Sequence, residues 1–566
     1  MDDRELLHQA QLWARMDPDP ETRAQVTTHI EANDLAWLAD HFARPLTFGT
    51  AGIRGPLGPG AARMNRAQIC LVAKAVADTL DISGADGPVV VAHDARRESP
   101  GFARDIIAVL RHARRTVIAC RGPVATPVAS WIARHHDAVA AIVVTASHNP
   151  IGDAGVKIYG PGGAQIVPPQ DGRIRAAMDA TVGLKGLATT TRAELLDAPA
   201  SPTAGALVVI EDAHEDYEEL MLLRQSRADG PGLTIVTTAL HGVAGGSVVR
   251  LLEAAGHEVH PVAAQQEPDG TFPTLTNPNP EDPITLELLL AEAKDRDADL
   301  AMANDPDGDR LAVAIPTDVG WRILTGNEVG ILLADHLLAG PGSLLVTTVV
   351  STPLVEALAE ARNATLVKTW TGFKWIAAAT AWAAEALGAT PALGFEEALG
   401  YCVGDVVADK DGIRAAATVA AMARQLADEG QTLESRLHEL QAAFGIWASA
   451  SLSLDVDEGV GDELVDRLVS EPPFEIDGRW VSTVVDHRTA ITDDLLWPEL
   501  PPAVIGELRA EGARLLVRPS GTEPKVKLYV HLHQLPGDDD IGGVEADLAA
   551  RARAALAFAA DYLELA

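Results

Sequence analysis

The sequence predicts an α/β protein with three tandem mixed α/β domains of similar topology and a C-terminal α+β domain. Three observations support this prediction. Short apolar runs typical of buried strands alternate with helical segments, as in parallel βαβ units. The same alternation recurs twice further along the 566-residue chain. The last hundred or so residues instead contain closely spaced strand-like runs, which are typical of an antiparallel sheet.

The expected elements follow one another in a regular order. The first 40 or so residues predict helix, because their apolar residues are spaced for one helical face. Strands are then predicted in three groups with helices between them: 88–94, 115–120 and 140–145; 233–240, 257–262 and 300–303; 342–350, 364–370 and 390–397. We expect four domains, with a linker at 197–206: 1–200, 201–320, 321–445 and 446–566.

Composition limits the classes of function. A formal net charge of −35 argues against sequence-independent nucleic-acid binding, so an anionic ligand needs a local basic pocket. The three separated cysteines predict a reducing compartment and no disulfide framework. With no apolar span of membrane length and no signal-like start, we expect a soluble, cytoplasmic protein without a membrane partner. No heptad pattern marks an interface, which leaves monomer and dimer open.

The loop NDPDGDR (304–310) predicts a metal site. It places Asp305, Asp307 and Asp309 two residues apart between two apolar strands, and converging carboxylates repel one another unless a divalent cation lies between them. Hard oxygen ligands favour Mg²⁺, with Mn²⁺ or Ca²⁺ as alternatives. An exposed acidic turn would leave these residues without a cation. An EF-hand does not fit, because the glycine is at position 4 of the loop and position 12 is Pro316.

Two further loops predict contacts with a sugar phosphate. In GFEEALGY (394–401), Glu396 and Glu397 follow an apolar strand and can accept hydrogen bonds from hydroxyl groups; a solvated acidic pair is the alternative. VRPSGTEPKVK (517–527) combines an arginine, two hydroxyl groups, a glycine and lysines, which together suit a phosphate monoester. A basic surface hairpin is the alternative there. The residues expected to hold phosphate are Arg518, Ser520, Gly521, Thr522 and Lys525.

The loop TASHNP (145–150) follows the apolar run AAIVV and supplies a candidate nucleophile. A serine needs a neighbouring base or a metal to be activated. Alone this loop is more often an ordinary turn, but a metal loop and a phosphate loop in the same chain favour Ser147 as a phosphoryl carrier whose ester bridges to the cation. Lys157 or His148 could then transfer the proton of a substrate hydroxyl.

These motifs, together with FGTAGIRG (48–55), resemble in order and spacing the α-D-phosphohexomutase superfamily, which includes phosphoglucomutases and phosphomannomutases. The resemblance covers about residues 40 to 530. It implies four domains around a central cleft that carry, in order, the phosphoserine, metal, sugar and phosphate loops. It also implies phosphate transfer between the C1 and C6 oxygens of an aldose, with Mg²⁺ and a hexose or pentose bisphosphate as activator.

The resemblance also implies roles for individual residues. Ser147 would be the phosphoserine and a metal ligand together with the three aspartates. Arg54, Lys157 and His148 are the candidates for proton transfer, and their order stays open. Arg310 would lie near the phosphoryl group, while Glu396, Glu397 and Lys374 would contact the sugar or a phosphate. The residues of the fourth loop would hold the phosphate that is not transferred.

One departure leaves the substrate open. Many members have a serine where this chain has Ala398, which removes one sugar contact. The variant GFEEALGY, with TGFKWI (371–376) and KDG (410–412), is similar to the branch that contains mammalian-type phosphoglucomutase 2 and enzymes acting on pentose phosphates. Glucose phosphate is the first expectation, with mannose phosphate next and ribose or deoxyribose phosphate as the alternative. A metal-dependent sugar phosphatase and a catalytically silent sugar-phosphate-binding protein are the rival classes.

Overall fold

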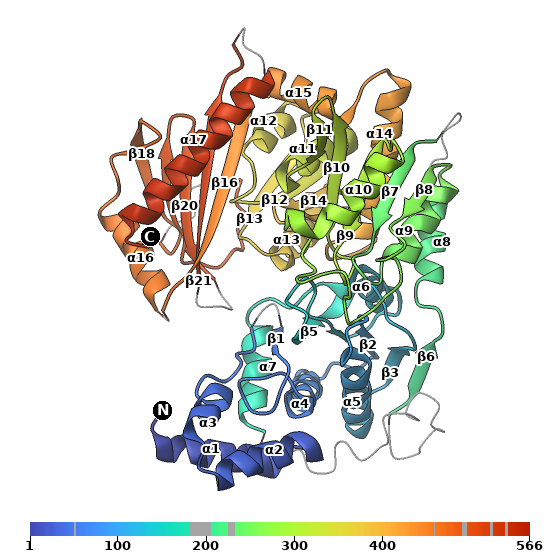
Figure 1. Ribbon diagram of the computed structural model, residues 1–566, viewed down its shortest axis with the longest axis vertical. Coiled ribbons are helices and arrows are strands. Elements are labelled where there is room, and N and C mark those ends of the chain that lie inside the picture. Colours follow the sequence, from blue (N-terminus) through green and yellow to red (C-terminus); the bar gives the residue numbers. More distant parts are fainter. Residues whose placement is uncertain are drawn as a thin grey trace. The chain divides into compact units, whose positions relative to one another are not determined.

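The chain folds into two compact units, whose elements are drawn in Figure 1. The first unit comprises Met1–Ile323 and Val406–Ala420, and the second comprises Leu324–Asp405 and Ala421–Ala566. The computed structural model describes residues 1–49, 52–181, 205–224, 232–457, 459–489, 495–520, 525–537 and 541–565. Most of the predicted linker 197–206 lies outside these residues.

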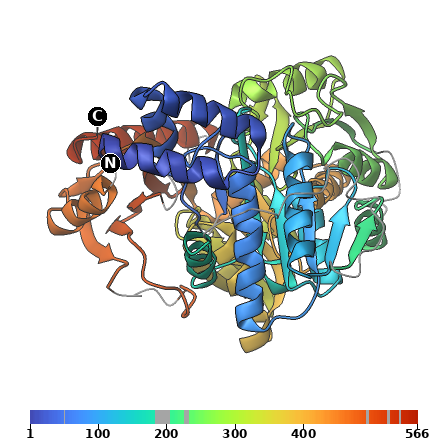
Figure 2. The ribbon, with the colours of Figure 1, turned by 90° about the horizontal axis from the view of Figure 1, so that it is seen from below.

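The N-terminal segment is helical, as its apolar spacing predicts, and forms three helices: α1 (Asp3–Met16), α2 (Pro20–Glu31) and α3 (Leu35–Phe42). Side chains of Asp2, Asp19 and Asp34 each accept a hydrogen bond from the first turn of the helix that follows, so each helix begins at an aspartate cap. Pro20 stands in the first turn of α2, where its missing N–H costs nothing. Figure 2 shows the three helices in dark blue, and their buried faces belong to the core of the first sheet.

The first sheet is mixed and has the order β1-β5-β4-β2-β3-β6. Strands β2, β3, β4 and β6 are parallel, β5 is antiparallel to β4, and β1 is antiparallel to β5. Its strands are β1 (Ile53–Pro56), β2 (Val89–His93), β3 (Val117–Cys120), β4 (Ala140–Val144), β5 (Asp153–Tyr159) and β6 (Leu207–Ile210). Its helices are α4 (Arg66–Ser83), α5 (Ser99–His112), α6 (Thr126–His135) and α7 (Gln170–Asp179), with the short η1 (Pro161–Gly163).

The second sheet has the order β11-β10-β9-β7-β8. Strand β7 is parallel to β8 and β9, whereas β10 is antiparallel to β9. Its strands are β7 (Thr234–Thr238), β8 (Glu258–Pro261), β9 (Leu300–Asn304), β10 (Leu311–Thr317) and β11 (Gly320–Ile323). The accompanying helices are α8 (Glu215–Arg224), α9 (Gly245–Ala254), η3 (Pro283–Leu286) and α10 (Glu287–Asp295).

The second unit contains the other two sheets. The third sheet, β13-β12-β14-β15, is mixed, and the fourth, β16-β21-β20-β19-β18-β17, is antiparallel throughout. The third contains β12 (Ser343–Thr348), β13 (Thr365–Thr369), β14 (Thr390–Glu396), β15 (Gly400–Val403), α11 (Gly326–Leu337), α12 (Leu354–Ala361), α13 (Phe373–Ala386) and α15 (Leu433–Phe444). Helix α14 (Gly412–Asp428) begins in the first unit and ends in the second. The fourth contains β16 (Ile446–Asp455), β17 (Glu475–Ile476), β18 (Arg479–Asp486), β19 (Gly506–Ala510), β20 (Ala513–Pro519), β21 (Lys525–Gln534), α16 (Val460–Ser470) and α17 (Ile541–Tyr562).

The predicted fold class is therefore confirmed: three mixed α/β sheets of similar plan precede an antiparallel α+β sheet. The domain boundaries at 200, 320 and 445 stay predictions. Two segments run across them, because β6 joins the first sheet and Val406–Ala420 joins the first unit. Among the described helices, none is both long enough and apolar enough to cross a bilayer.

The three mixed sheets repeat one arrangement. In each, a buried strand is parallel to the strand on one side and continues through a short loop into an antiparallel strand on the other side. These hairpins are β4–β5, β9–β10 and β14–β15. Their loops are the predicted serine, aspartate and glutamate loops, so one topological position presents a polar loop three times.

The third and fourth sheets share an apolar core. Trp370 and Phe373 from the third sheet and its helix α13 belong to the same buried cluster as Trp497, Leu516 and Tyr529. The indole N–H of Trp370 donates to the carbonyl oxygen of Pro501 at 2.8 Å. Backbone hydrogen bonds join Lys368 of β13 to Leu495 and Trp497. The second unit is therefore one body built around a core that the two sheets contribute to together.

We predict that the second unit loses stability in mild acid through His531 on β21. This histidine is 1% exposed, and burial lowers its pKa from 6.5 to about 3. Between these values the unfolded chain binds a proton that the folded chain does not. The contribution of His531 to the free energy of unfolding is therefore fully present above pH 6.5 and is lost as the pH falls towards 3. A change from pH 7 to pH 5 should lower the free energy of unfolding by about 2 kcal/mol through the protonation of this residue in the unfolded chain.

The measurement is scanning calorimetry at the two pH values. His531→Gln should lose less stability than the native chain between pH 7 and pH 5, because glutamine does not titrate. His438→Gln, on α15, serves as the control and should keep the native pH dependence. An unchanged pH dependence in His531→Gln would contradict the prediction.

Candidate active site

The candidate nucleophile Ser147 follows β4 and is held in an uncommon conformation. Its backbone φ is +51°, in the left-handed region that few residues other than glycine adopt. The side chain is 2% exposed, and the hydroxyl group lies 2.9 Å from Asp305 Oδ2 and 3.1 Å from His148 Nδ1. The Ser147 N–H donates to Thr145 Oγ1 at 2.8 Å. The loop thus fixes the hydroxyl group beside a carboxylate and an imidazole.

The metal loop follows β9 and brings three buried carboxylates together. Asp305, Asp307 and Asp309 are each 0% exposed, and ligand oxygens of the three lie within 4.8 Å of one another. Gly308 has φ +72°, which allows the tight bend between them, and a Cβ there would lie 2.8 Å from Ala244 Cβ. Burying three like charges is costly unless cations accompany them.

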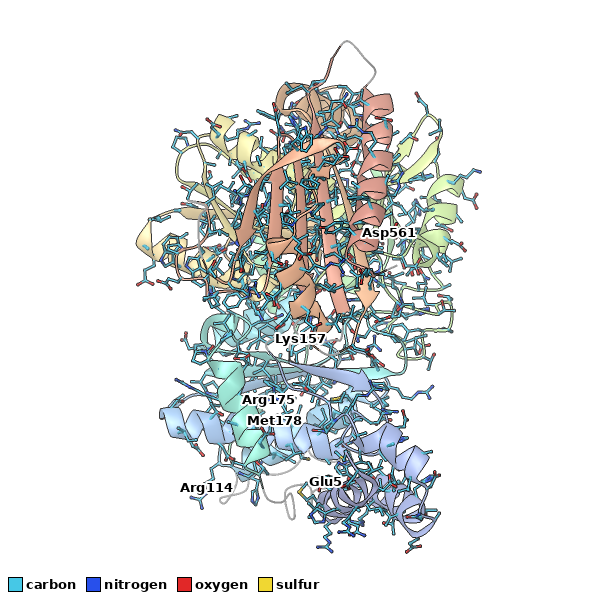
Figure 3. All side chains as sticks on the ribbon, turned by 90° about the vertical axis from the view of Figure 1, so that its left-hand side faces the viewer. Glu5, Arg114, Lys157, Arg175, Met178 and Asp561 are labelled. Carbon is cyan, nitrogen blue, oxygen red and sulfur yellow. The ribbon has the colours of Figure 1, made fainter. Side chains whose placement is uncertain are left out.

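Two lysines and a threonine contact the buried aspartates and offset part of the cost of burying their negative charge. Lys157 on β5, labelled in Figure 3, places its ammonium group 2.6 Å from Asp307 Oδ2 and 2.6 Å from Asp309 Oδ2. Thr126 Oγ1 donates to Asp307 Oδ2 at 2.6 Å, and Lys410 Nζ lies 3.4 Å from Asp309 Oδ2. Burial alone would lower the pKa of Lys157, but the two aspartates raise it above its ordinary value, so this residue carries a positive charge.

The remaining carboxylate oxygens fit a divalent cation. Burial, followed by the charges of Asp307 and Asp309, raises the pKa of Asp305 well above its ordinary value. Among the described residues, no hydrogen-bond donor reaches the buried Oδ1 atoms of Asp307 and Asp309. Hard carboxylate oxygens in this arrangement are the ligands that Mg²⁺ prefers. The three aspartates therefore fit the predicted Mg²⁺ site.

The other predicted residues of the first unit surround the same loops. Arg54 on β1 donates to Asn149 Oδ1 at 3.3 Å. His148 is partly buried, and burial together with Arg310 and Arg54 lowers its pKa well below 6.5, so its ring is neutral near pH 7. The Arg310 N–H donates to Asp305 Oδ1 at 3.0 Å, and its guanidinium pairs with Glu281 at 2.9 Å. The structure thus brings together all the predicted residues of this unit.

Lys410 is a site residue that the sequence reasoning did not assign. Asp409 and Asp411, which flank it in the sequence, are buried and accept hydrogen bonds from two different elements. Asp409 accepts from the hydroxyl group of Tyr159 on β5 at 2.7 Å, and Asp411 accepts from the hydroxyl group of Tyr217 on α8 at 2.6 Å. The alternating charges of the run DKD (409–411), next to a glycine, were the available signal.

The predicted sugar loop lies in the second unit, between β14 and β15. Glu396 is 6% exposed, and Glu397 accepts a hydrogen bond from Thr348 Oγ1 at 3.3 Å. Lys374 stands in the first turn of α13, where its ammonium group lies 5.2 Å from the centre of the Trp375 ring. The acidic pair is therefore partly enclosed rather than a freely solvated turn.

The predicted phosphate loop connects β20 and β21 in the same unit. Arg518 donates to the hydroxyl oxygen of Tyr529 at 3.2 Å. Burial, followed by the charge of Glu397, raises the pKa of Tyr529 to about 12. Tyr529 thus lies within electrostatic reach of both hairpins, and the sequence reasoning missed it. The Ser520 N–H donates to the carbonyl oxygen of Lys525 at 2.7 Å, while Gly521 and Thr522 lie outside the described residues.

Comparison with known proteins assigns the chain to a family. Four models described as phosphoglucomutase/phosphomannomutase match in chain order: alpha/beta/alpha domain I at 45–182, domain II at 215–320, domain III at 325–444 and the C-terminal domain at 474–536. The chain belongs to the phosphoglucomutase/phosphomannomutase family. It is an enzyme of the mutase type, an isomerase that transfers a phosphoryl group within one molecule. The helices α1–α3 precede the matched region.

Individual relatives carry different names. A probable phosphomannomutase of Haemophilus influenzae is 35% identical over 82% of this chain and 92% of its own length. The phosphopentomutase of Mus musculus is 31% identical over 93% of this chain and 90% of its own. A solved family structure from Burkholderia thailandensis has a TM-score of 0.68 at 23% identity, covering 91% of this chain and 97% of that one, and shows the shared fold.

Replacing one carboxylate of the metal loop should weaken cation binding. Asp307→Asn keeps the shape of the side chain but removes a charge from the cluster, so the Mg²⁺ concentration that gives half-maximal activity should rise roughly tenfold or more. Direct calorimetric titration with Mg²⁺ measures the same loss without a substrate. Asp318→Asn, in the exposed turn after β10, is the matched control. An unchanged Mg²⁺ affinity in Asp307→Asn would remove this residue from the metal site.

Proposed function

We propose that the chain interconverts aldose 1-phosphates and aldose 6-phosphates through a phosphoserine at Ser147 and a bisphosphorylated sugar intermediate. Glucose phosphate is the favoured substrate, and mannose phosphate is the next candidate. The observation that carries this proposal is the position of the Ser147 hydroxyl, 2.9 Å from Asp305 Oδ2 in a loop beside three buried aspartates. A hydroxyl group there is aimed at the place where phosphoryl charge can be neutralised.

Asp305, Asp307 and Asp309 would hold Mg²⁺, with phosphorylated Ser147 as a further ligand. When bound, the cation supplies positive charge that neutralises the transferring phosphoryl group. Lys157 and Lys410 add fixed positive charge next to Asp307 and Asp309, and Arg310 stands at the end of the same loop. These side chains therefore assist phosphoryl transfer by electrostatics and orientation.

Proton transfer needs a group close to the reacting oxygen. His148 touches the nucleophile directly, at 3.1 Å from Ser147 Oγ. Arg54 reaches the same loop through Asn149, and Lys157 lies on the strand that follows it. All three are candidates for the general acid or base, and the hydrogen bond to Ser147 supports His148 as the partner of the serine itself.

The second unit contains the candidates for contacts with the sugar and with the phosphate that is not transferred. Glu396, Glu397 and Lys374 are the candidates for sugar contacts. Arg518 and Lys525, with Ser520, Gly521 and Thr522, are the candidates for holding the phosphate that is not transferred. The bisphosphate would turn end for end without leaving, and a hexose or pentose bisphosphate would act as the activator that phosphorylates Ser147.

Phosphopentomutase activity is the second candidate. The mouse relative is named for it and is similar along 93% of this chain. The small Ala398 in the loop between Glu397 and β15 also removes the hydroxyl group that we expect to contact a hexose. Hydrolysis of the phosphoserine by water would instead make the protein a sugar phosphatase.

The deciding experiment offers single substrates to the purified protein with Mg²⁺ and a trace of glucose 1,6-bisphosphate. Glucose 1-phosphate, mannose 1-phosphate and ribose 1-phosphate are tested separately, and both the isomerised product and free phosphate are measured. A kcat/KM that favours a hexose supports the first proposal. A preference for ribose 1-phosphate supports the pentose alternative, and release of free phosphate alone would overturn a mutase.

Ser147→Ala should lose activity by roughly a thousandfold or more, because no other described hydroxyl group occupies its position beside Asp305. The variant should also fail to take up label from radioactive bisphosphate. Ser83→Ala, at the exposed end of α4, is the control and should behave like the native chain. Covalent labelling that persists in Ser147→Ala would assign the phosphoryl group to another residue.

A further inference from the structure

We propose that Arg96 is a positioning residue for the nucleophile: its guanidinium holds the backbone of the loop after β4 so that Ser147 points at Asp305. This inference rests on the proposed role of Ser147 as the phosphoryl carrier. Arg96 lies beyond the end of β2, the strand next to β4 in the sheet, and is 4% exposed. It touches the nucleophile's backbone rather than the reacting atoms.

One guanidinium binds several carbonyl oxygens of this loop. Nη2 donates to Ser147 O at 2.8 Å and to Asn149 O at 2.6 Å, while Nη1 donates to Pro150 O at 2.9 Å and to Asp153 O at 3.1 Å. A longer bond of 3.5 Å joins Nη1 to Ile151 O. The two terminal nitrogens therefore follow the loop from its nucleophile to the start of β5. A planar fork of donors can do this, whereas a lysine ammonium offers a single point of charge.

The loop needs such a clamp because its own backbone does not form a regular structure. Ser147 is in the left-handed region, and Pro150 has no N–H to donate. The carbonyl oxygens of Ser147, Asn149, Pro150 and Asp153 all lie within hydrogen-bond distance of one guanidinium, and of these Pro150 O also accepts from the Asp153 N–H at 3.0 Å. Left-handed conformations at residues other than glycine persist only when the surroundings enforce them.

Arg96 is itself held through its backbone, and its guanidinium is flanked by an aspartate and an aromatic ring. Asp94 Oδ1 accepts from the Arg96 N–H at 3.0 Å and from Ser99 Oγ at 2.6 Å, and Asp94 Oδ2 lies 3.6 Å from Arg96 Nε. The Phe272 ring lies 5.2 Å from the guanidinium carbon. Arg96 also forms a backbone bridge with Gly270, where an added Cβ would lie only 2.3 Å from Ala95 O. These contacts fix the backbone of Arg96 and place a carboxylate and an aromatic ring beside its guanidinium.

A positioning role and a merely structural role predict different kinetics. Displacing a catalytic group by about 1 Å can cost about a hundredfold in rate. We expect Arg96→Lys and Arg96→Ala to lower kcat on the preferred sugar phosphate by about that factor while KM changes little, since the contacts to the substrate are intact. A structural role would lower activity only in proportion to the folded fraction.

The test compares these variants with Arg97→Gln, an exposed neighbour that should behave like the native chain. Steady-state kinetics are measured with Mg²⁺ and glucose 1,6-bisphosphate, and thermal unfolding reports the folded fraction. Millimolar guanidinium chloride should restore part of kcat in Arg96→Ala but none in Ser147→Ala. Asp94→Asn, which keeps the arginine, should show a smaller loss of the same kind if the Arg96 variants do not fold.

Amide hydrogen exchange separates this inference from the proposed function. In Arg96→Lys, exchange should rise at residues 147–153 and stay native in the strands of the sheet, whatever substrate the protein uses. A rise in KM at native kcat, or native exchange in the loop, would overturn the clamp. A native chain that converts no sugar phosphate would overturn the proposed function, and the exchange result would then still decide whether Arg96 holds the loop.

Discussion

The burial of three carboxylates at one point is the constraint on which the first unit depends. Asp305, Asp307 and Asp309 are inaccessible to water, and like charges that close together need compensation from positive groups. The structure draws that compensation from distant parts of the chain, with Lys157 from the first sheet and Lys410 from a segment that precedes α14. The segment 406–420 joins the first unit through this region, and two buried tyrosine–aspartate hydrogen bonds hold it there. The contacts that hold the segment 406–420 in the first unit therefore also bring Lys410 to the carboxylate cluster.

A single topological device places the chemistry. The serine, aspartate and glutamate loops each connect a buried strand to an antiparallel neighbour, so each polar loop starts where a strand in the middle of a sheet ends. Buried strands on both sides of such a loop limit its freedom, and this explains how short polar segments can hold strained or charged conformations. Ser147 in the left-handed region and Gly308 in the tight bend are two results of the same arrangement.

The sequence predicts site loops that are made of consecutive residues. It does not predict the residues that tertiary packing brings to these loops from distant parts of the chain. The loops that contain Ser147, Asp307 and Glu396 are short runs at strand ends, so their places in the sheets and the alternating fold could be predicted from the sequence. Arg96 and Arg97 are adjacent and chemically identical, and only the folded chain shows that the first is buried and the second exposed. Lys410 and Tyr529 were missed for the same reason, since their partners lie far away in sequence. Helix over the first 40 or so residues was predictable from the apolar spacing, and the structure shows where the aspartate caps divide this segment into three helices.

The common core of the third and fourth sheets has a consequence for selectivity. Trp370, Trp497, Leu516 and Tyr529 pack together, so the hairpin with Glu396 and the hairpin with Arg518 belong to one compact unit with a common core. A hinge between those two hairpins would have to pull this core apart, which close packing resists. If the two hairpins hold the hydroxyl groups and the far phosphate of the sugar, the distance between the hairpins selects substrates by the length of the carbon chain. The selectivity between five-carbon and six-carbon sugar phosphates would then depend on the packing of the tryptophans in the core as much as on the side chains that contact the sugar.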